Sequence, residues 1–329
     1  MKDVIMKVDN VSKHFEIKSK SIFQPSKELK AVNNVSFDVY KGETLGIIGE
    51  SGSGKSTLGK CMIRMTGLTK GNIIYKDTVL NELPEKSMKA MRNEIQVIFQ
   101  DPYSSLDPRK TAGYLIEEPM IIHNMYTAEE RKKKVIELLK LVGLNESHAI
   151  RYPHEFSGGQ RQRINIARAL ALNPEIVLAD EPVSALDVSV QAQVINLMKD
   201  LQKKLGLTYV FISHDLSVVK YISDRIAIMY LGKIVEIGDA KVIYKDPKHP
   251  YTKALFSAIP RENPLEHKEK IDLNGEIPSP IDLPEGCSFA SRCPNAIEKC
   301  KSILPELIDI GENHKVSCLM VEENLEKAL

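Results

Sequence analysis

A glycine-rich segment that ends in Lys-Ser constrains this chain more than any other feature. The pattern G-x-x-x-x-G-K-[ST] is matched in full by Gly49-Glu50-Ser51-Gly52-Ser53-Gly54-Lys55-Ser56. The apolar run Thr44–Ile48 precedes it, and a helical pattern from about Lys55 to Met65 follows it. A strand, a glycine-rich turn and a helix in this order are the context that supports a phosphate-binding loop.

The residue types of this loop indicate its chemistry. Glycines let the backbone approach phosphate oxygens closely, so that its N–H groups point at them. The positive end of the helix dipole adds attraction for anions. Lys55 supplies a mobile charge for the β- and γ-phosphates of a nucleotide, and the Ser56 hydroxyl can ligate Mg²⁺. We assign the segment from Gly49 to Thr57 to nucleotide binding.

Two adjacent carboxylates close another apolar run. Ile176–Ala179 is typical of a buried parallel strand, and Asp180 and Glu181 follow it. Because ligands bind at the carboxyl ends of strands in α/β sheets, these acids are expected to face the phosphate-binding loop. Asp180 is suited to hold Mg²⁺ through water, and Glu181 to act as general base toward the attacking water. The alternative is that the two acids cap the following helix.

Strand patterns alternate with helical patterns through most of the chain, which predicts an α/β core with a largely parallel sheet. Further strands are expected at Val4–Val11, Val32–Val39, Ile95–Phe99 and Tyr209–Ser213, with a polar loop or hairpin over Lys18–Lys30. The region 110–162 is helical in pattern and is expected to be an insertion on that core. After Asp239 prolines multiply and periodicity fades, so residues 240–329 are expected to form a C-terminal appendage.

Composition and charge narrow the class of protein. The chain has 45 Lys and Arg against 44 Asp and Glu, a formal net charge of +1, so no binding to nucleic acid is expected. The densest basic run, Arg131–Lys134, follows a capping box at Thr127–Glu130 and is interpreted as a solvated helix face. No stretch approaches the roughly 18 apolar residues of a membrane span, and the N-terminus lacks the pattern of a signal peptide. We therefore expect a cytosolic protein, in which structural disulfides are uncommon.

A second glycine motif resembles that of a known family. Phe156-Ser157-Gly158-Gly159-Gln160 resembles the L-S-G-G-Q signature of ABC transporter ATPases, with Phe at a usually apolar position. A serine and two glycines that open a helix form a second anion-binding site. In the family, this site reaches the γ-phosphate of ATP held by the opposite subunit. The resemblance spans about Val4 to Asp239. For residues 1–239 it implies an ABC-type phosphate-loop NTPase core, an N-terminal antiparallel β-subdomain and the helical subdomain at 110–162.

The other residues of the family's nucleotide site have counterparts in the expected order. Gln100 follows a predicted strand and resembles the Q-loop glutamine, which contacts Mg²⁺ or the attacking water. Ser184–Asp187 resembles the D-loop, which assigns Asp187 to the nucleotide site. His214 resembles the switch histidine at the γ-phosphate, and Phe15 lies where the family places an aromatic residue that stacks on adenine. A structural histidine and a core aromatic residue are the respective alternatives.

Three segments resemble the oligopeptide and dipeptide importer ATPases: Gln100–Arg109, Tyr152–Gln160 and His249–Leu255. The intact S-G-G-Q is similar to that of the F-type ATPase of these importers. The resemblance implies a head-to-tail dimer with a D-type ATPase beneath two membrane permeases, served by an extracytoplasmic peptide-binding protein. The implied protein is a translocase subunit that couples ATP hydrolysis to peptide import and is peripheral to the cytoplasmic face of the membrane.

Two other functions fit parts of the pattern. Nickel, opine and glutathione importers use close relatives of this machine, and their cargo selectivity belongs to the binding protein and the permease. Soluble ABC ATPases of DNA repair or translation usually carry a long coiled-coil insertion or two ATPase domains. Neither feature is visible in this sequence.

Four cysteines lie in the Pro-rich C-terminal region: Cys287, Cys293, Cys300 and Cys318. Four thiolates can hold tetrahedral Zn²⁺ or an iron–sulfur cluster, and the spacing does not choose between them. The segment Gly286–Pro294 resembles the tail of peptide-importer ATPases in which a [4Fe–4S] cluster occurs. That cluster is therefore the expected cofactor beside ATP and Mg²⁺, with Zn²⁺ or free thiols as alternatives. Cys61 is expected to be a small buried apolar residue.

Overall fold

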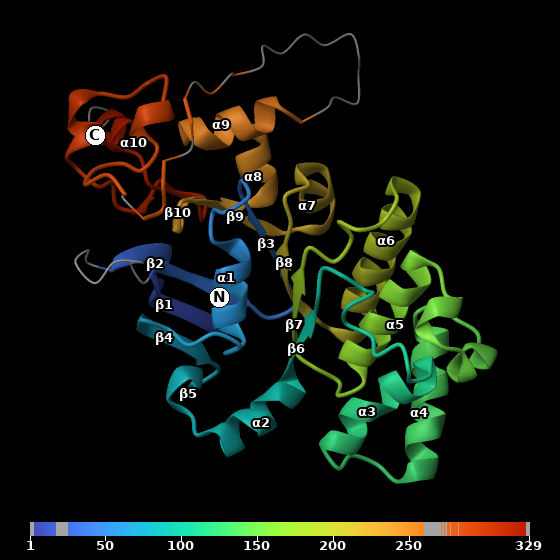
Figure 1. The fold of residues 1–329 in the computed structure, drawn as a ribbon. Helices are drawn as coiled ribbons and strands as arrows, with labels where there is room; N and C mark the ends of the chain where they lie inside the picture. The colour runs from blue at the N-terminus through green and yellow to red at the C-terminus, as the bar shows by residue number, and fades with distance from the viewer. Residues whose placement is uncertain are drawn as a thin grey trace. The chain divides into compact units, whose positions relative to one another are not determined.

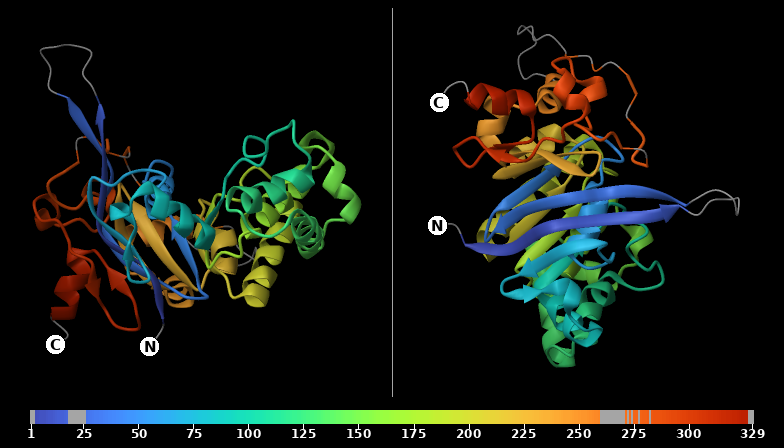
Figure 2. Two further views of the ribbon diagram at one scale, coloured as in Figure 1. Left: turned by 90° about the horizontal axis from the view of Figure 1, so that it is seen from below. Right: turned by 90° about the vertical axis from the view of Figure 1, so that its left-hand side faces the viewer.

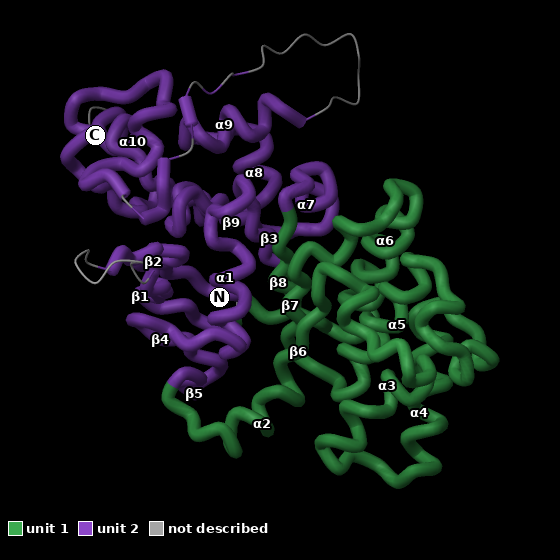
Figure 3. Tube along the Cα trace, viewed as in Figure 1, with its two compact units in different colours: residues 1–3, 40–44, 82–213 green, residues 4–39, 45–81, 214–329 purple. Residues whose placement is uncertain are grey.

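The structure is a computed structural model that describes residues 3–17, 26–259, 271, 273, 275–276, 278–281 and 283–326. The chain divides into two compact units (Figure 3). The first comprises residues 1–3, 40–44 and 82–213, and the second comprises residues 4–39, 45–81 and 214–329. Both units therefore combine segments that are far apart in the sequence. Among the described residues, no helix combines the length and the apolar character needed to cross a membrane.

Three parallel strands of the first unit run side by side (Figure 1). In spatial order they are β8 (Thr208–Ile212), β7 (Ile176–Asp180) and β6 (Ile95–Ile98). Ile176 of β7 is in register with Ile95 on one side and with Thr208 on the other. Because β7 has a strand on each side and its first four residues are buried, it is apolar along that length, as predicted. Parallel pairing brings the residues that follow β6 and β7 to the same edge.

Helices make up most of the remainder of the first unit. They are α2 (Glu85–Glu94), α3 (Ala112–Ile122), α4 (Ala128–Leu141), α5 (Gly158–Leu170) and α6 (Val188–Leu205), with the 3₁₀ turns η2 (Glu146–Ile150) and η3 (Pro153–Glu155). The predicted capping box of α4 is confirmed, since Thr127 accepts a hydrogen bond from the Glu130 backbone and the Glu130 side chain accepts one in return. The helix stops near Gly143, whose φ of 74° is left-handed.

The N-terminal strands of the second unit form a sheet in the order β2-β1-β4-β5. They are β1 (Val4–Ile17), β2 (Lys27–Tyr40), β4 (Lys70–Tyr75) and β5 (Thr78–Val79), and η1 (Leu80–Glu82) follows them. β4 pairs antiparallel with both β1 and β5, which confirms the predicted antiparallel N-terminal subdomain. Figure 2 shows β1 and β2 as two long neighbouring strands.

Both N-terminal strands are longer than the predicted Val4–Val11 and Val32–Val39. The added residues are mostly exposed or half-buried. Backbone hydrogen bonds between neighbouring strands do not require apolar side chains, so the hydropathy pattern underestimates such strands. Of the predicted loop at Lys18–Lys30, residues 27–30 belong to β2, and residues 18–25 lie outside the described part of the chain.

A second set of strands in this unit joins the phosphate-binding loop to the C-terminal region. In spatial order they are β3 (Thr44–Ile48), β9 (Arg225–Tyr230), β10 (Lys233–Asp239), β12 (Lys315–Val316) and β11 (Ile308–Asp309). β3 and β9 are parallel, whereas the later pairs are antiparallel. The C-terminal region thus contributes two short strands, of which β12 pairs with β10 and β11 pairs with β12.

The second unit also contains short helices. They are α1 (Lys55–Met62), α7 (Leu216–Ile222), α8 (Ala240–Lys245), α9 (Pro250–Ser257) and α10 (Leu319–Glu326), with the 3₁₀ turns η4 (Ala290–Arg292) and η5 (Glu298–Lys301). The prediction that α1 reaches Met65 is wrong by three residues. The chain leaves the helix because Arg64 has a left-handed φ of 54°.

Candidate functional site

The phosphate-binding loop of the second unit connects β3 to α1. Gly49, Gly52 and Gly54 have φ values of 153°, 77° and 101°, in the range that favours glycine. A Cβ at Gly49 would lie 2.2 Å from the carbonyl oxygen of Met229, and one at Gly54 would lie 2.1 Å from that of Ala31. Glycine is therefore required at these two positions by both backbone conformation and packing.

Lys55 opens α1 and is only 5% exposed. Its Nζ donates to the carbonyl oxygens of Gly49, at 2.8 Å, and Glu50, at 2.9 Å, and lies 3.5 Å from Oγ of Ser53. The N-cap, Gly54, has no side chain to bond the first N–H groups of α1. A buried cation beside a helix N-terminus is an arrangement that favours phosphate. Ser56 and Thr57 follow in the first turn.

Phe15 and His214 also belong to the second unit. Phe15 lies on β1, is 40% exposed, and has Nζ of Lys13 4.9 Å from its ring centroid. The alternative that Phe15 is a core residue is therefore wrong. His214 is exposed and directly precedes Asp215, the N-cap of α7, so it is not a buried structural histidine.

At the carboxyl ends of β6 and β7, the first unit brings two predicted site residues into contact. Nε2 of Gln100 donates to Oε2 of Glu181 over 2.8 Å. Glu181 has a left-handed φ of 48°, and its N–H donates to the carbonyl oxygen of Ile212 on β8. Asp180 is the last residue of β7 and is half-buried. A left-handed backbone conformation is uncommon for a residue other than glycine, and it occurs here at the residue that contacts Gln100.

The two acids at the carboxyl end of β7 do not cap the next helix. That helix, α6, begins at Val188 with Asp187 as its N-cap. Between them, Ser184 donates from both its N–H and its hydroxyl to the carbonyl oxygen of Glu181. The capping alternative for Asp180 and Glu181 is therefore wrong, and both carboxylates remain candidates for chemistry.

The predicted second anion site opens α5. Ser157 is the N-cap, its Oγ accepts from the N–H of Gln160 at 3.3 Å, and Oε1 of Gln160 accepts from the N–H of Ser157 at 3.0 Å. The pattern S-x-x-Q is the sequence signature of such a reciprocal capping box, so the motif caps α5 in addition to its predicted role as an anion site. A Cβ at Gly159 would lie 2.4 Å from Cγ1 of Val190. Gly159 is thus required by the packing of α5 against α6.

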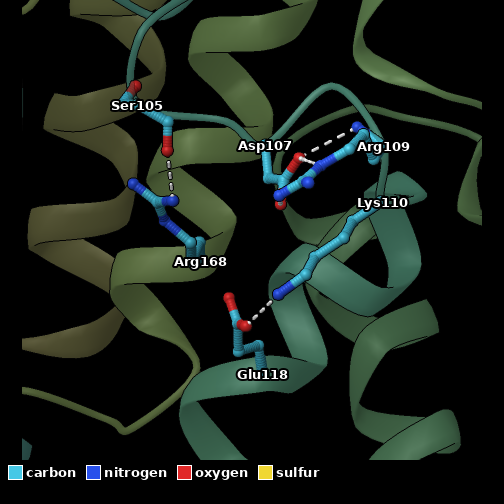
Figure 4. Close-up of polar contacts among 6 residues, drawn as sticks. All are labelled: Ser105, Asp107, Arg109, Lys110, Glu118 and Arg168. Carbon is cyan, nitrogen blue, oxygen red and sulfur yellow. Dashed lines mark hydrogen bonds and ion pairs between the residues drawn. The ribbon is translucent and has the colours of Figure 1, made fainter.

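The segment after Gln100 is attached to α5. Nδ2 of Asn165 donates to Oγ of Ser105 at 3.0 Å. Nη1 of Arg168 donates to the Ser105 carbonyl oxygen at 2.6 Å, as Figure 4 shows. Burial lowers the pKa of the Arg168 guanidinium. The guanidinium of Arg161 lies 3.8 Å from the ring centroid of Tyr103. The helix that starts at the signature motif therefore holds the segment that starts at Gln100.

Two ion pairs fix the end of the same segment (Figure 4). Nε and Nη2 of Arg109 both donate to the Asp107 carboxylate at 3.0 Å. These bonds lower the pKa of Asp107 to about 2. Lys110 pairs with Glu118 of α3, and the same contact raises the pKa of Lys110. Because the pairs are exposed or half-exposed, they orient the segment rather than stabilise the fold strongly.

The four C-terminal cysteines share one neighbourhood but do not form the predicted ligand set. The four residues lie near one another, and the N–H of Cys287 donates to the carbonyl oxygen of Cys300 at 2.8 Å. Among the described residues, however, no three His, Cys, Asp or Glu side chains are arranged to hold a metal ion. Burial raises the pKa of the Cys287 thiol to about 11, and neutral thiols have no attraction that draws them together. Cys61 is buried on α1, as expected.

Comparison with known proteins places the chain in a family. Residues 32–184 match the family described as ABC transporter, and residues 235–300 match that described as oligopeptide/dipeptide transporter, C-terminal region. The oligopeptide transport ATP-binding protein AppF of Bacillus subtilis (strain 168) is 54% identical over 96% of this chain and 97% of its own length. The dipeptide transport ATP-binding protein DppF of Escherichia coli (strain K12) is 48% identical over 97% and 95%.

A solved structure shows the same fold. The dimeric post-hydrolysis structure of the ATP-binding cassette MJ0796, bound to ADP and Pi, is 33% identical with a TM-score of 0.63, over 71% of this chain and 98% of that one. The similarity confirms the predicted ABC ATPase fold, and the relatives confirm the family over nearly the whole chain. The chain therefore belongs to the ABC transporter family of ATP-hydrolysing subunits, in the branch that carries the oligopeptide/dipeptide transporter C-terminal region.

Proposed function

We propose that this chain energises the import of dipeptides or oligopeptides by binding and hydrolysing ATP beneath membrane permeases. The names of its relatives, which refer to oligopeptide and dipeptide transport, support this cargo class over nickel, opines or glutathione. The match to the oligopeptide/dipeptide transporter C-terminal region supports it independently. The same relatives argue against a role in DNA repair or translation.

The contact between Gln100 and Glu181 is the observation that carries the catalytic part of this proposal. A phosphate-binding loop alone indicates nucleotide binding, whereas hydrolysis needs a base that orients water. Glu181 is held by the Gln100 amide at 2.8 Å. An amide N–H that donates to one carboxylate oxygen fixes the orientation of the whole group.

The family resemblance assigns a role to each candidate residue. Phe15 stacks on the adenine; the loop from Gly49 to Thr57, with Lys55, binds the phosphates. From the family resemblance, Ser56, Gln100 and Asp180 would hold Mg²⁺, Glu181 would activate water, and His214 would contact the γ-phosphate. Bound MgATP supplies the phosphoryl group that is transferred to this water.

Catalysis requires a second copy of the ATPase fold. The signature residues Ser157–Gln160, together with Asp187, complete the site of the opposite subunit. ATP binding favours the closed dimer because both subunits contact the γ-phosphate, and hydrolysis removes that link. The segment Gln100–Arg109, held to α5 by Ser105, passes the motion to the permeases.

The partners follow from this arrangement. They are a related D-type ATPase, two permeases and, through them, an extracytoplasmic peptide-binding protein, and they place this chain at the cytoplasmic face of the membrane. Within the chain, residues 1–239 form the ATPase domain, with the helical subdomain at 110–162, and residues 240–329 form the C-terminal region. Purification of the tagged chain from membranes, with identification of attached subunits, tests the assembly. The rate of ATP hydrolysis by that complex should rise when peptide-loaded binding protein is added. It should stay at its basal value when the same binding protein is added with nickel in place of peptide.

For the C-terminal region we propose a [4Fe–4S] cluster ligated by Cys287, Cys293, Cys300 and Cys318. The shared neighbourhood of the four thiols supports it, although the described side chains do not converge on one point. Bound Zn²⁺ and free thiols are the two alternatives, and measuring the metal bound per chain distinguishes them from the cluster.

A further inference from the structure

We propose that the C-terminal region positions the phosphate-binding loop through Arg292 and Tyr251, which bind the side chain and the backbone of Glu50. All three residues belong to the second unit. Neither Arg292 nor Tyr251 is expected to touch the nucleotide, so both are positioning residues. The proposal adds a role in ATP binding for a region whose sequence lies far from the loop.

Arg292 binds the Glu50 carboxylate with two bonds. Nη1 lies 2.9 Å from Oε2 and Nη2 lies 3.4 Å from Oε1. The Arg292 side chain is 8% exposed and that of Glu50 is 27% exposed. A bidentate pair largely removed from water is both stronger and more directional than an exposed ion pair. Breaking it would leave one charge buried without its partner.

Tyr251 binds the backbone of the same residue. Its hydroxyl accepts from the N–H of Glu50 at 2.9 Å, and the side chain is fully buried near the start of α9. The ring packs against Tyr230, with centroids 4.7 Å apart, and against Phe289 at 5.4 Å. The Tyr230 hydroxyl in turn lies 3.5 Å from Nη1 of Arg292. These contacts fix the hydroxyl of Tyr251 and the guanidinium of Arg292 relative to each other.

Glu50 connects these contacts to the phosphate-binding lysine. Its carbonyl oxygen accepts from Nζ of Lys55 at 2.9 Å. Glu50 therefore uses its carboxylate for Arg292, its N–H for Tyr251 and its carbonyl for Lys55. Because Arg292 holds the carboxylate of Glu50 and Tyr251 holds its N–H, the peptide group that carries the Glu50 carbonyl is fixed as well. Loss of either contact should let this peptide turn and should place the lysine less accurately for phosphate.

The test measures MgATP affinity of the full chain with a fluorescent ATP analogue, and KM and kcat of the assembled complex. Arg292→Gln and Tyr251→Phe should each weaken MgATP binding and raise KM by about two- to tenfold, with a smaller change in kcat. Because both residues hold Glu50, the effects of the two substitutions are expected to be coupled. Arg292→Lys keeps the charge but loses the bidentate geometry, so it should restore affinity in part.

Two matched variants serve as controls. Lys299→Gln removes a positive charge from the C-terminal region. The Lys299 side chain is 64% exposed and pairs with Glu323. Tyr244→Phe removes a hydroxyl that donates to the carbonyl oxygen of Leu216 at 2.8 Å. Both should bind MgATP like the unmodified chain. An affinity loss in Tyr244→Phe as large as that in Tyr251→Phe would overturn the proposal, because the effect would then be general destabilisation.

A double-variant cycle tests the pair directly. Glu50→Gln, Arg292→Gln and the double variant should weaken binding by similar factors, since each removes the same interaction. Thermal unfolding identifies any variant that fails to fold, and Tyr251→Phe, which deletes a single oxygen atom, remains informative if Arg292→Gln does fail. Unchanged MgATP affinity in folded Arg292→Gln or in folded Tyr251→Phe would overturn the positioning role.

Discussion

The side-chain amide of Gln100 donates a 2.8 Å hydrogen bond to Oε2 of Glu181 across 81 residues of sequence. The two residues meet because β6 and β7 are parallel neighbours and each residue follows its strand. Gln100 thereby orients the carboxylate that we propose as the general base. The contact also links the candidate base to the segment that starts at Gln100 and is held by α5.

Replacing Glu181 with Gln should preserve ATP binding and remove most hydrolysis. The amide keeps the size of the side chain and can still accept from Gln100, but it has no basicity. General-base catalysis usually contributes about 10²–10⁴-fold. The measurement is single-turnover ATP hydrolysis by the assembled complex, with Glu146→Gln as the control because Glu146 is an exposed ion-pair residue. A rate reduced by less than about threefold would exclude Glu181 as the base.

Gly159→Ala should impair the signature helix although alanine favours helices. A gain of about 1 kcal/mol from helix propensity is expected, but the new Cβ would lie 2.4 Å from Cγ1 of Val190. The clash should lower the thermal unfolding midpoint and reduce ATPase activity of the complex. Val190→Ala in the same chain should relieve it. If Gly159→Ala alone is as stable and active as the parent, the packing of α5 on α6 does not require glycine.

The chain purified alone should be a weak ATPase, because its signature residues complete the site of another subunit. Activity per molecule should rise with protein concentration, and again on addition of the second ATPase and the permeases. Steady-state hydrolysis over a dilution series measures this. High activity that does not change on dilution would indicate a self-contained site and contradict the shared-site mechanism.

Stability should fall in mildly acidic solution because of His249. This residue is 1% exposed, and its Nδ1 accepts from the N–H of Tyr251 at 3.0 Å. Burial lowers its pKa from 6.5 to about 4. Because the pKa is lower in the folded state, the unfolded chain takes up the proton first as the pH falls. The stabilisation is complete above about pH 6.5 and is lost toward about pH 4, by on the order of 3 kcal/mol.

His249→Asn tests this assignment, since asparagine is a good N-cap and does not titrate. Unfolding by denaturant is measured for both proteins at about pH 7, above the two pKa values, and at about pH 5, between the folded and unfolded pKa values. The free energy of unfolding should decrease less for His249→Asn than for the parent. Equal decreases would assign the acid sensitivity to other groups.

The nucleotide loop was predictable from sequence because its determinants are local. The glycines, Lys55 and the flanking strand and helix lie within one short segment, and backbone conformation requires glycine at Gly49 and Gly54. The strand β7 was equally predictable, since its first four residues are buried and apolar. The ends of β1 and β2 were not, because exposed strand ends leave no hydropathy signal.

Contacts between distant segments required the structure. Arg292 and Glu50 are 242 residues apart, and no pattern in the sequence relates an arginine in a Pro-rich region to a loop glutamate. The exposure of Phe15 and the start of α6 at Val188, after Asp187, were likewise known only from the structure. The first observation excludes Phe15 as a core residue, and the second excludes Asp180 and Glu181 as caps of α6.

The last prediction concerns metal in the C-terminal region. If its four cysteines bind a [4Fe–4S] cluster, chain prepared without oxygen should be brown and contain about four irons. Zinc would leave it colourless with about one metal ion per chain. Unmetallated protein would instead titrate as five free thiols after denaturation, the four of this region and Cys61.

Substitution of single cysteines separates a ligand from a bystander. Cys300→Ser should reduce bound metal, whereas Cys61→Ser should not, since Cys61 is buried on α1. Because a metal that binds only the folded region stabilises it, Cys300→Ser should also make the chain after Asp239 more sensitive to protease. Anaerobic protein with neither iron nor zinc, and a protease pattern that Cys300→Ser leaves unchanged, would show that these thiols are not ligands.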